Sequence, residues 1–302
     1  MTDPFLCSDL VVHSRYAYAR AAAEDGDWLA AAEVLEQALE RAPQWPPALF
    51  ALGEALEKLG EAERAAEAFR ASLGADPQDS QGAAARLALL GVAPAPATLP
   101  PAYLARLFDG YAPRFDRHLV EALGYRGPVQ ISEALATIAP GRRFAATLDL
   151  GCGTGLAGVA LRARVERLTG IDISPAMVEK ARALQIYDAL EVGEIVAHLE
   201  RYEQEFDLIV AADAFVYIGD LSGVFVAAAR ALRRGGLFAF TVEAFEGEGY
   251  RLNATMRFSH TRAYVEATAV AAGLRPLAVK PDWARREAGG EAPGLVCAFG
   301  WD

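Results

Sequence analysis

One short segment, TLDLGCGTGLAG at residues 147–158, limits what this chain can fold into. An apolar run ends in a turn with glycine at three alternate positions, Gly151, Gly153 and Gly155, and a helical pattern follows. Because glycine has no Cβ, such a turn can be tight and a ligand can lie directly against its backbone. A buried strand that turns into a helix in this way is typical of an open parallel sheet, where ligands bind at the carboxyl ends of the strands. Taken alone, the segment fits a packing turn, a phosphate-binding turn or the seat of another cofactor.

The sequence on either side of this turn alternates between short apolar runs and helical patterns. Strands are expected at 146–151, 167–173, 189–192, 206–213 and 235–244, and a closing antiparallel pair at 275–283 and 294–301. Helices are expected at 156–165, 174–184, 221–232 and 261–274. Apolar strands that alternate with helices predict an α/β fold with a doubly wound, largely parallel sheet of seven strands.

The N-terminal part of the chain contains an internal repeat with a period of 34 residues. Small, apolar and proline positions recur at this offset: Ala19 with Gly53, Gly26 with Gly60, Ala31 with Ala65, Leu35 with Phe69, Ala38 with Ser72, and Pro43 with Pro77. Each unit holds two helical patterns separated by a glycine and ended by a proline. Small residues suit the close approach of two antiparallel helices, and the larger ones fill the space between neighbouring pairs.

This pattern resembles the tetratricopeptide repeat. We expect a helical domain at 1–91, made of two repeats and a capping helix at 80–90, because a solenoid needs a closing helix over its last apolar face. The proline-rich stretch 92–101 predicts a semi-rigid linker, and a second domain is expected at 102–302. Such repeats either dock a protein partner or mediate self-association, and the sequence leaves both open.

Composition restricts the class of protein. The chain has 53% hydrophobic and 23% charged residues, and its N-terminus lacks the basic start of a secretory signal, so we expect a soluble, cytoplasmic protein with no membrane contact. Three separated cysteines and four histidines with no helical i, i+3 or i+4 pairing predict reduced thiols and no metal site. The net charge is −11, with most of the acidic excess before Pro101, which argues against nucleic acid as a partner.

Two carboxylates indicate which cofactor the turn holds. The spacing is G-x-G-x-G rather than the dinucleotide G-x-G-x-x-G, and Asp149 stands just before the first glycine. A carboxylate there suits a cationic ligand group better than a pyrophosphate. Asp172 ends the next strand about 20 residues after Gly151, where an acidic side chain meets ribose hydroxyls. An adenosyl cofactor with a cationic tail is S-adenosylmethionine.

Together these residues resemble a class I S-adenosylmethionine-dependent methyltransferase: LDLGCGTG its first motif, GIDISPAMVEKAR its second strand and helix, and FDLIVAADAFVYIGDL its fourth strand. With the repeats, the chain is similar to a group of bacterial methyltransferases that carry tetratricopeptide repeats. The resemblance implies that Asp149, Gly151, Gly153 and Gly155 surround the methionine part of the cofactor and that Asp172 holds the ribose. It places Ile173, Met177, Glu194 and Ile195 on the adenine side, although a methionine at position 177 also fits an ordinary helix core.

The acceptor side is less determined by the sequence. Tyr111 and Phe115 share a helical face and are expected to cover the methionine end as a lid, although the same spacing is ordinary core packing. The remaining candidates are Asp213 for contact with cofactor or substrate, Phe215 and Tyr217 for the pocket wall, and His260 for the general base and pocket. His260 also fits a structural role at a helix start, and His118 is a weaker candidate base. A small-molecule acceptor is expected, with a protein-directed enzyme or a cofactor-sensing module as the alternative.

Overall fold

The computed structural model describes the 302-residue chain except residues 1–6, 116–123 and 288–289. The chain divides into two compact units, Met1–Tyr103 and Leu104–Asp302, which we call the N-terminal and the C-terminal unit. Each is described by itself. Within the described part, no helix is both long enough and apolar enough to cross a membrane.

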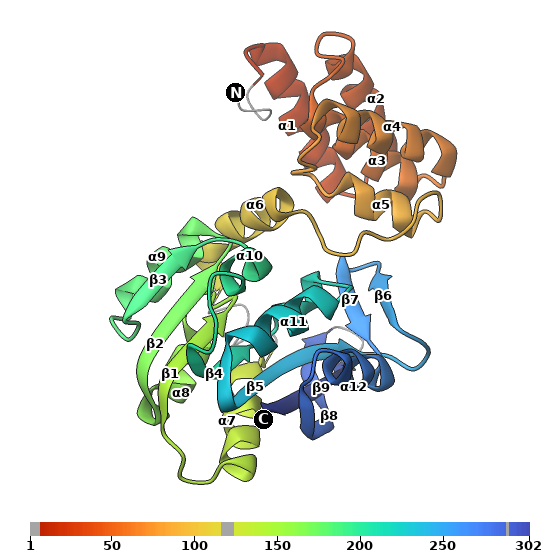
Figure 1. Cartoon of the computed structure of the whole chain (residues 1–302). Helices are drawn as coiled ribbons and strands as arrows, with labels where there is room; N and C mark the ends of the chain where they lie inside the picture. The colour runs from red at the N-terminus through yellow and green to blue at the C-terminus, as the bar shows by residue number, and fades with distance from the viewer. Residues whose placement is uncertain (1–6, 116–123, 288–289) are drawn as a thin grey trace. The chain divides into compact units, whose positions relative to one another are not determined.

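The N-terminal unit consists of helices (Figure 1). They are α1 (Leu10–Glu24), α2 (Trp28–Leu39), α3 (Pro46–Lys58), α4 (Ala62–Ala75) and α5 (Ala83–Leu89). The side chains of Asp9 and Asp27 accept backbone N–H groups and so start α1 and α2, whereas prolines open α3. Gly26 and Gly60 separate the helices of each pair in the left-handed conformation that favours glycine.

The positions that repeat in the sequence form the core of this unit. Ala19, Ala31 and Ala65 are at most 1% exposed, and so are Leu35 and Phe69. Gly53 on α3 is a contact point, because a Cβ there would lie 2.6 Å from the Phe69 ring on α4. The repeat period therefore reflects two helical hairpins, and in the second of them a small residue faces a large one.

Gly53→Ala is expected to destabilise the N-terminal unit although alanine is the better helix former. Overpacking costs about 1–3 kcal/mol, which outweighs a helix-propensity gain of about 1 kcal/mol. Gly74→Ala is the matched control, since Gly74 lies in α4 with nothing within 4 Å of a Cβ, so its expected effect is stabilising. Differential scanning calorimetry of the full chain measures both variants. Equal shifts of the same sign would contradict the steric argument.

The C-terminal unit is built on one mixed sheet. Its strands are β1 (Phe144–Leu150), β2 (Val165–Asp172), β3 (Ala189–Val192), β4 (Phe206–Ala211), β5 (Leu232–Ala244), β6 (Tyr250–Asn253), β7 (Arg257–His260), β8 (Arg275–Glu287) and β9 (Gly290–Trp301). Its helices of two turns or more are α6 (Pro101–Tyr111), which begins in the N-terminal unit, α7 (Gly127–Ile138), α9 (Pro175–Ala183), α11 (Ser222–Ala231) and α12 (Arg262–Ala271). Shorter ones are α8 (Leu156–Leu161), α10 (Ile195–Leu199), η1 (Ala112–Arg114), η3 (Arg162–Arg164) and η4 (Phe215–Tyr217).

The strand order is β3-β2-β1-β4-β5, all parallel, and β5 then pairs with β9 in antiparallel fashion, while β9 pairs with β8. The predicted doubly wound α/β fold is confirmed. Two strands lie beyond the seven expected: β6 and β7 form a hairpin, and β7 pairs in parallel with the last residues of β5. The chain order reverses between β1 and β4, so the carboxyl ends of these strands form the edge where such sheets bind ligands.

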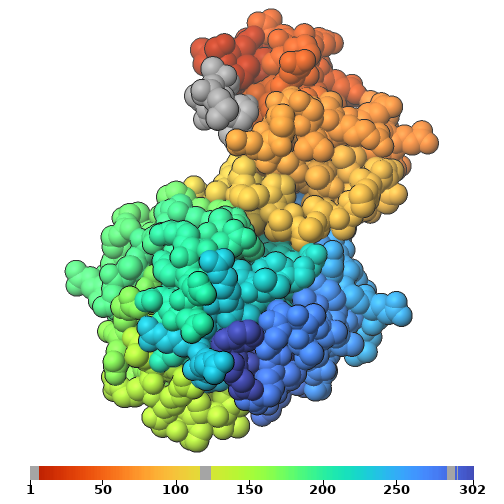
Figure 2. Space-filling model, in the orientation of Figure 1, coloured from red at the N-terminus to blue at the C-terminus, as the bar shows by residue number. Residues whose placement is uncertain are grey.

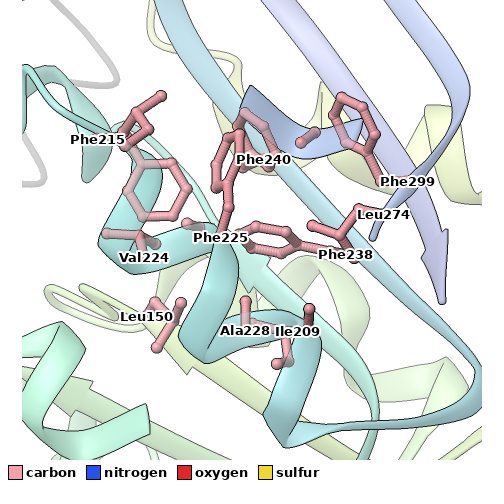
Figure 3. Close-up of a cluster of buried hydrophobic side chains, with 14 of the residues drawn as sticks. Leu150, Ile209, Phe215, Val224, Phe225, Ala228, Phe238, Phe240, Leu274 and Phe299 are labelled. Atoms are coloured by element: carbon pink, nitrogen blue, oxygen red, sulfur yellow. The ribbon is translucent and has the colours of Figure 1, made fainter. Parts of the chain in front are cut away.

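Separate apolar cores cover the two faces of the sheet. Helices α7 and α8 pack on one face, and α10, α11 and α12 pack on the other. The second face is rich in phenylalanine: Phe225, Phe238 and Phe240 meet with ring centroids 4.8–5.7 Å apart (Figure 3). The chain's last residues, in the darkest blue, reach the surface of this unit (Figure 2). These cores hold the strand ends, and with them the site, in fixed positions.

Candidate active site

The glycine turn, residues 151–155, joins β1 to α8. All three alternate glycines have a positive φ, of 64°, 54° and 98° for Gly151, Gly153 and Gly155. Their surroundings differ: a Cβ would lie 2.7 Å from the Ala214 side chain at Gly151 and 2.7 Å from Leu184 at Gly155. Among the residues that the structure describes, the atom nearest to a Cβ at Gly153 is Phe115 Cε1, at 4.0 Å. Of the three, Gly153 therefore leaves an open face, whereas Gly151 and Gly155 make room for the protein itself.

Asp172, the last residue of β2, lies against this turn. One of its carboxylate oxygens accepts the Gly153 N–H at 2.9 Å, and the other accepts the Ser174 N–H at 2.9 Å. The residue is 8% exposed, and burial raises the pKa of its carboxyl group, while the two backbone N–H groups oppose that rise. The structure thus brings together Gly153 and Asp172, which the sequence assigned to the same cofactor.

Asp149 is buried behind the turn. Its Oδ2 accepts a hydrogen bond from the Tyr187 hydroxyl at 2.7 Å, and its Oδ1 is buried with no hydrogen-bond partner in the part of the chain that the structure describes. Burial raises the pKa of Asp149 to about 7, against the lowering effect of the Tyr187 hydroxyl. Sequence reasoning missed Tyr187. The sequence held only an indirect sign of Tyr187: positions 158 and 170 are glycines, and a Cβ at either position would collide with the Tyr187 ring.

The predicted lid residues reach the same place. Phe115 follows η1 and extends its ring toward Gly153, and Tyr111 packs edge-on against it, with centroids 5.2 Å apart. Asp109 on α6 fixes this segment, since it accepts from the Ser174 hydroxyl at 2.6 Å and from the Ala176 N–H at 3.2 Å. His118 lies outside the described residues.

The residues expected on the adenine side start two helices. Met177 is 1% exposed, and its N–H binds the Ser174 hydroxyl that caps α9. Glu194 caps α10, because its carboxylate accepts from the N–H groups of Val196 and Ala197. Ile173 and Ile195 are partly exposed. For all four residues, contact with a cofactor stays a prediction.

A second polar cluster lies at the carboxyl ends of β4 and β5; its members are Asp213, Tyr217, Glu243 and Arg257, the acceptor-side cluster. Arg257 Nη2 is 2.7 and 2.8 Å from the two Asp213 oxygens. Its Nε donates to Glu243 at 2.6 Å, and its Nη1 donates to the Tyr217 hydroxyl at 2.8 Å. Burial alone would lower the pKa of Arg257, but the neighbouring carboxylates hold it well above its ordinary value.

Arg257 is a largely buried member of this cluster. Its side chain is 13% exposed, and those of Asp213 and Glu243 are 17% and 8% exposed. Asp213 has a φ of 59°, unusual for a residue other than glycine, and its N–H binds the Thr241 hydroxyl. Asp213 and Tyr217 were expected near the site from the sequence, whereas the contribution of Arg257 was not, because the β6–β7 hairpin that carries it was not expected.

The structure contradicts the prediction for His260. This residue ends β7 and is 0% exposed, and its Nε2 donates to the carbonyl oxygens of Ile218 and Gly219 at 2.9 and 3.1 Å. Burial lowers the pKa of His260 to about 4. An imidazole with its N–H held by backbone carbonyls and no exposed edge is a structural group, so it is neither a general base nor a pocket residue here.

Phe215 is also corrected. It is 0% exposed and points into the phenylalanine core, with its ring centroid 5.2 Å from that of Phe240 (Figure 3). Tyr217, two residues along η4, points the other way: its hydroxyl accepts from Arg257, and its ring meets Phe108 edge-on at 5.3 Å. The turn of the 3-10 helix sends one aromatic side chain inward and the other to the site.

Comparison with known proteins agrees with this geometry. Residues 148–240 match the family described as "Methyltransferase domain", and residues 16–80 match the family described as "Tetratricopeptide repeat". The chain thus carries a class I S-adenosylmethionine-dependent methyltransferase domain preceded by tetratricopeptide repeats, as the sequence motifs predicted.

Among curated proteins, it is 34% identical over 110 residues to "Malonyl-[acyl-carrier protein] O-methyltransferase" of Salmonella typhimurium, covering 36% of this chain and 43% of that protein. It is 31% identical over 121 residues to "Ubiquinone biosynthesis O-methyltransferase" of Xanthomonas campestris, covering 38% and 49%. The matches thus span about half the length of these relatives. In fold, it resembles Burkholderia thailandensis 1,6-didemethyltoxoflavin-N1-methyltransferase, with a TM-score of 0.54 and 20% identity, covering 69% of this chain and 93% of that one.

Proposed function

We propose that this protein transfers a methyl group from S-adenosylmethionine to a small-molecule acceptor. The observation that carries the proposal is the open face at Gly153, bordered by the Asp172 carboxylate and the Phe115 ring, with Asp149 behind it. We assign the activity to residues 102–302, with 92–101 as the linker to a repeat domain at 1–91.

The residues at the turn suit this cofactor. An ionised Asp172 has lone pairs left for the ribose hydroxyls after accepting two backbone N–H groups. The missing side chain of Gly153 leaves space for the methionine part, and the Asp149 side chain supplies negative charge close to its cationic groups. When bound, the cofactor would supply a methyl group on a sulfonium: the acceptor would form a bond to the methyl carbon as the carbon–sulfur bond breaks, and the sulfur would leave as the neutral thioether S-adenosylhomocysteine. The rings of Tyr111 and Phe115 exclude water from that centre and favour a cation near their faces.

The acceptor-side cluster indicates what the nucleophile is. Asp213 directly precedes Ala214, whose side chain packs where a Gly151 Cβ would be, so the cluster borders the turn. Arg257 is already paired with two carboxylates, which makes it a poor partner for a third, so we propose a hydroxyl or amine acceptor rather than a free carboxylate. Asp213, at the cluster's more exposed edge, would accept a proton where the acceptor must lose one. The names of both curated relatives specify transfer to oxygen, which supports oxygen rather than nitrogen as the acceptor atom.

Asp172→Ala tests the cofactor site. It is expected to weaken S-adenosylmethionine binding about 10- to 100-fold, because a hydrogen bond to a charged group contributes about 1.5–3 kcal/mol. Isothermal calorimetry on the full chain measures the dissociation constant. Glu179→Ala removes an exposed carboxylate from the neighbouring α9 and is the control, with no expected change. Equal affinity in wild type and Asp172→Ala, or no binding by the wild type, would refute the proposed function.

A further inference from the structure

Tyr187 occupies a slot that three glycines leave open. The ring lies where a Cβ would stand on Gly155, Gly158 and Gly170, which belong to the turn, to α8 and to β2. At Gly170 the Cβ would be 2.8 Å from the ring, and at Gly155 it would be 3.2 Å away. Larger residues at these positions would displace the tyrosine. The glycines of this region thus serve Tyr187 as much as they serve a ligand.

In this position the Tyr187 hydroxyl donates to Asp149. That hydrogen bond, at 2.7 Å, goes to Oδ2 of a carboxyl group that is 0% exposed. The backbone N–H of Gly158 also favours its charged form, but among the described residues its Oδ1 has no hydrogen-bond partner. A buried carboxylate with so few donors is costly unless a cation lies nearby. The titratable groups that act on or around Asp149 are Tyr187, Asp172, Cys152 and Tyr125, and at neutral pH none of these four side chains carries positive charge.

We propose that Tyr187 is a positioning residue of the cofactor site, which holds the Asp149 carboxylate behind the glycine turn so that its negative charge attracts the cationic methionine end of the cofactor. This inference rests on the proposed function. Tyr187 touches neither cofactor nor acceptor in this role; it acts through Asp149.

The direction of the pH effect follows from the same contacts. Burial raises the pKa of Asp149 to about 7, and the Tyr187 hydroxyl lowers it from what it would otherwise be. As pH falls through this value Asp149 takes up a proton and loses its attraction for the cofactor, so binding weakens. Without the hydroxyl the pKa rises further, and the weakening begins at higher pH.

Calorimetric titration with S-adenosylmethionine from about pH 5.5 to pH 7, where the cofactor's own amino group, with a pKa of about 8, stays largely protonated, tests the proposal. We expect Tyr187→Phe to weaken binding about 5- to 10-fold near pH 7 and to shift the pH dependence upward. Asp149→Asn should flatten that dependence and remove the effect of Tyr187→Phe in the double variant. The control is Tyr202→Phe, at a tyrosine that packs on Phe206 away from the turn.

A wild-type measurement also tests the proposal should Tyr187→Phe fold poorly. Near pH 6.5, titration in two buffers of different ionisation enthalpy should show release of a fraction of a proton on binding. Three results would overturn the inference while leaving the proposed function intact. They are binding without proton release, an unchanged pH dependence of binding in Tyr187→Phe, and the same loss of affinity from Tyr187→Phe whether residue 149 is Asp or Asn. Absence of cofactor binding by the wild type would overturn both.

Discussion

Arg257→Met is expected to lower the free energy of unfolding of the C-terminal unit by about 3–5 kcal/mol, because it leaves buried carboxylates without their counter-charge. Arg257 donates to Asp213 and Glu243, and the side chains of all three residues are less than a fifth exposed. Methionine fills a similar volume, so the loss is electrostatic rather than a cavity effect. For a unit of this size, the shift corresponds to a drop in Tm of roughly 6–20 °C.

Differential scanning calorimetry of the full chain measures this shift. Arg262→Met is the matched control: Arg262 pairs with Glu266 one helical turn away, its side chain is 58% exposed, and we expect almost no change. Adding Asp213→Asn and Glu243→Gln to Arg257→Met should recover part of the loss, because the uncompensated charges are then gone. If the Tm drop in Arg257→Met were no larger than that in Arg262→Met, the ion pairs of the acceptor-side cluster would not contribute to the stability of the C-terminal unit.

Gly155→Ala and Gly153→Ala should fail in different ways although both lie in the glycine turn. Gly155 has a φ of 98°, and a Cβ there meets Leu184 at 2.7 Å, so backbone strain and overpacking together cost about 2–5 kcal/mol of stability. Gly153 has a φ of 54°, and no atom of the described residues lies closer than 4.0 Å to a Cβ there, so Gly153→Ala costs only about 1–2 kcal/mol. Its methyl group, however, stands on the open face, where we propose that the cofactor lies.

Thermal unfolding and calorimetric binding of S-adenosylhomocysteine separate these outcomes. Gly153→Ala should keep most of its Tm and bind the ligand about 10-fold or more weakly, because a misfit of this kind costs about 1–3 kcal/mol. Gly155→Ala should show the larger drop in Tm. If Gly153→Ala bound with wild-type affinity, the open face would not be the cofactor site, and the proposed function would lose its main observation.

Much of the fold could be predicted because its signals are local. The strands that became β1, β2 and β4 are apolar runs ended by turn residues, and the 34-residue period predicted the paired helices of the N-terminal unit. The contact between Gly53 and Phe69 came only from the structure. Asp172 was also predictable, because it directly ends an apolar strand, and the carboxyl ends of parallel strands meet at one edge of the sheet.

The acceptor side was less predictable, because its partners are distant in sequence and join only through the sheet. Arg257 meets Asp213 across 44 positions of the chain, and it does so because β7 pairs in parallel with the end of β5. For His260 the sequence left open a general base or a structural role at a helix start, and the same pairing decides for the structural role, because it buries the imidazole where it donates to the Ile218 carbonyl.

The sequence alone determined that an adenosyl cofactor with a cationic tail suits the turn, since glycine spacing and the positions of Asp149 and Asp172 are local facts. The tertiary structure decided what each glycine is for. Gly151 and Gly155 make room for Ala214 and Leu184, and Gly153 leaves a face open. That distinction depends on which side chains fold back against the turn, and packing between elements distant in the chain sets it.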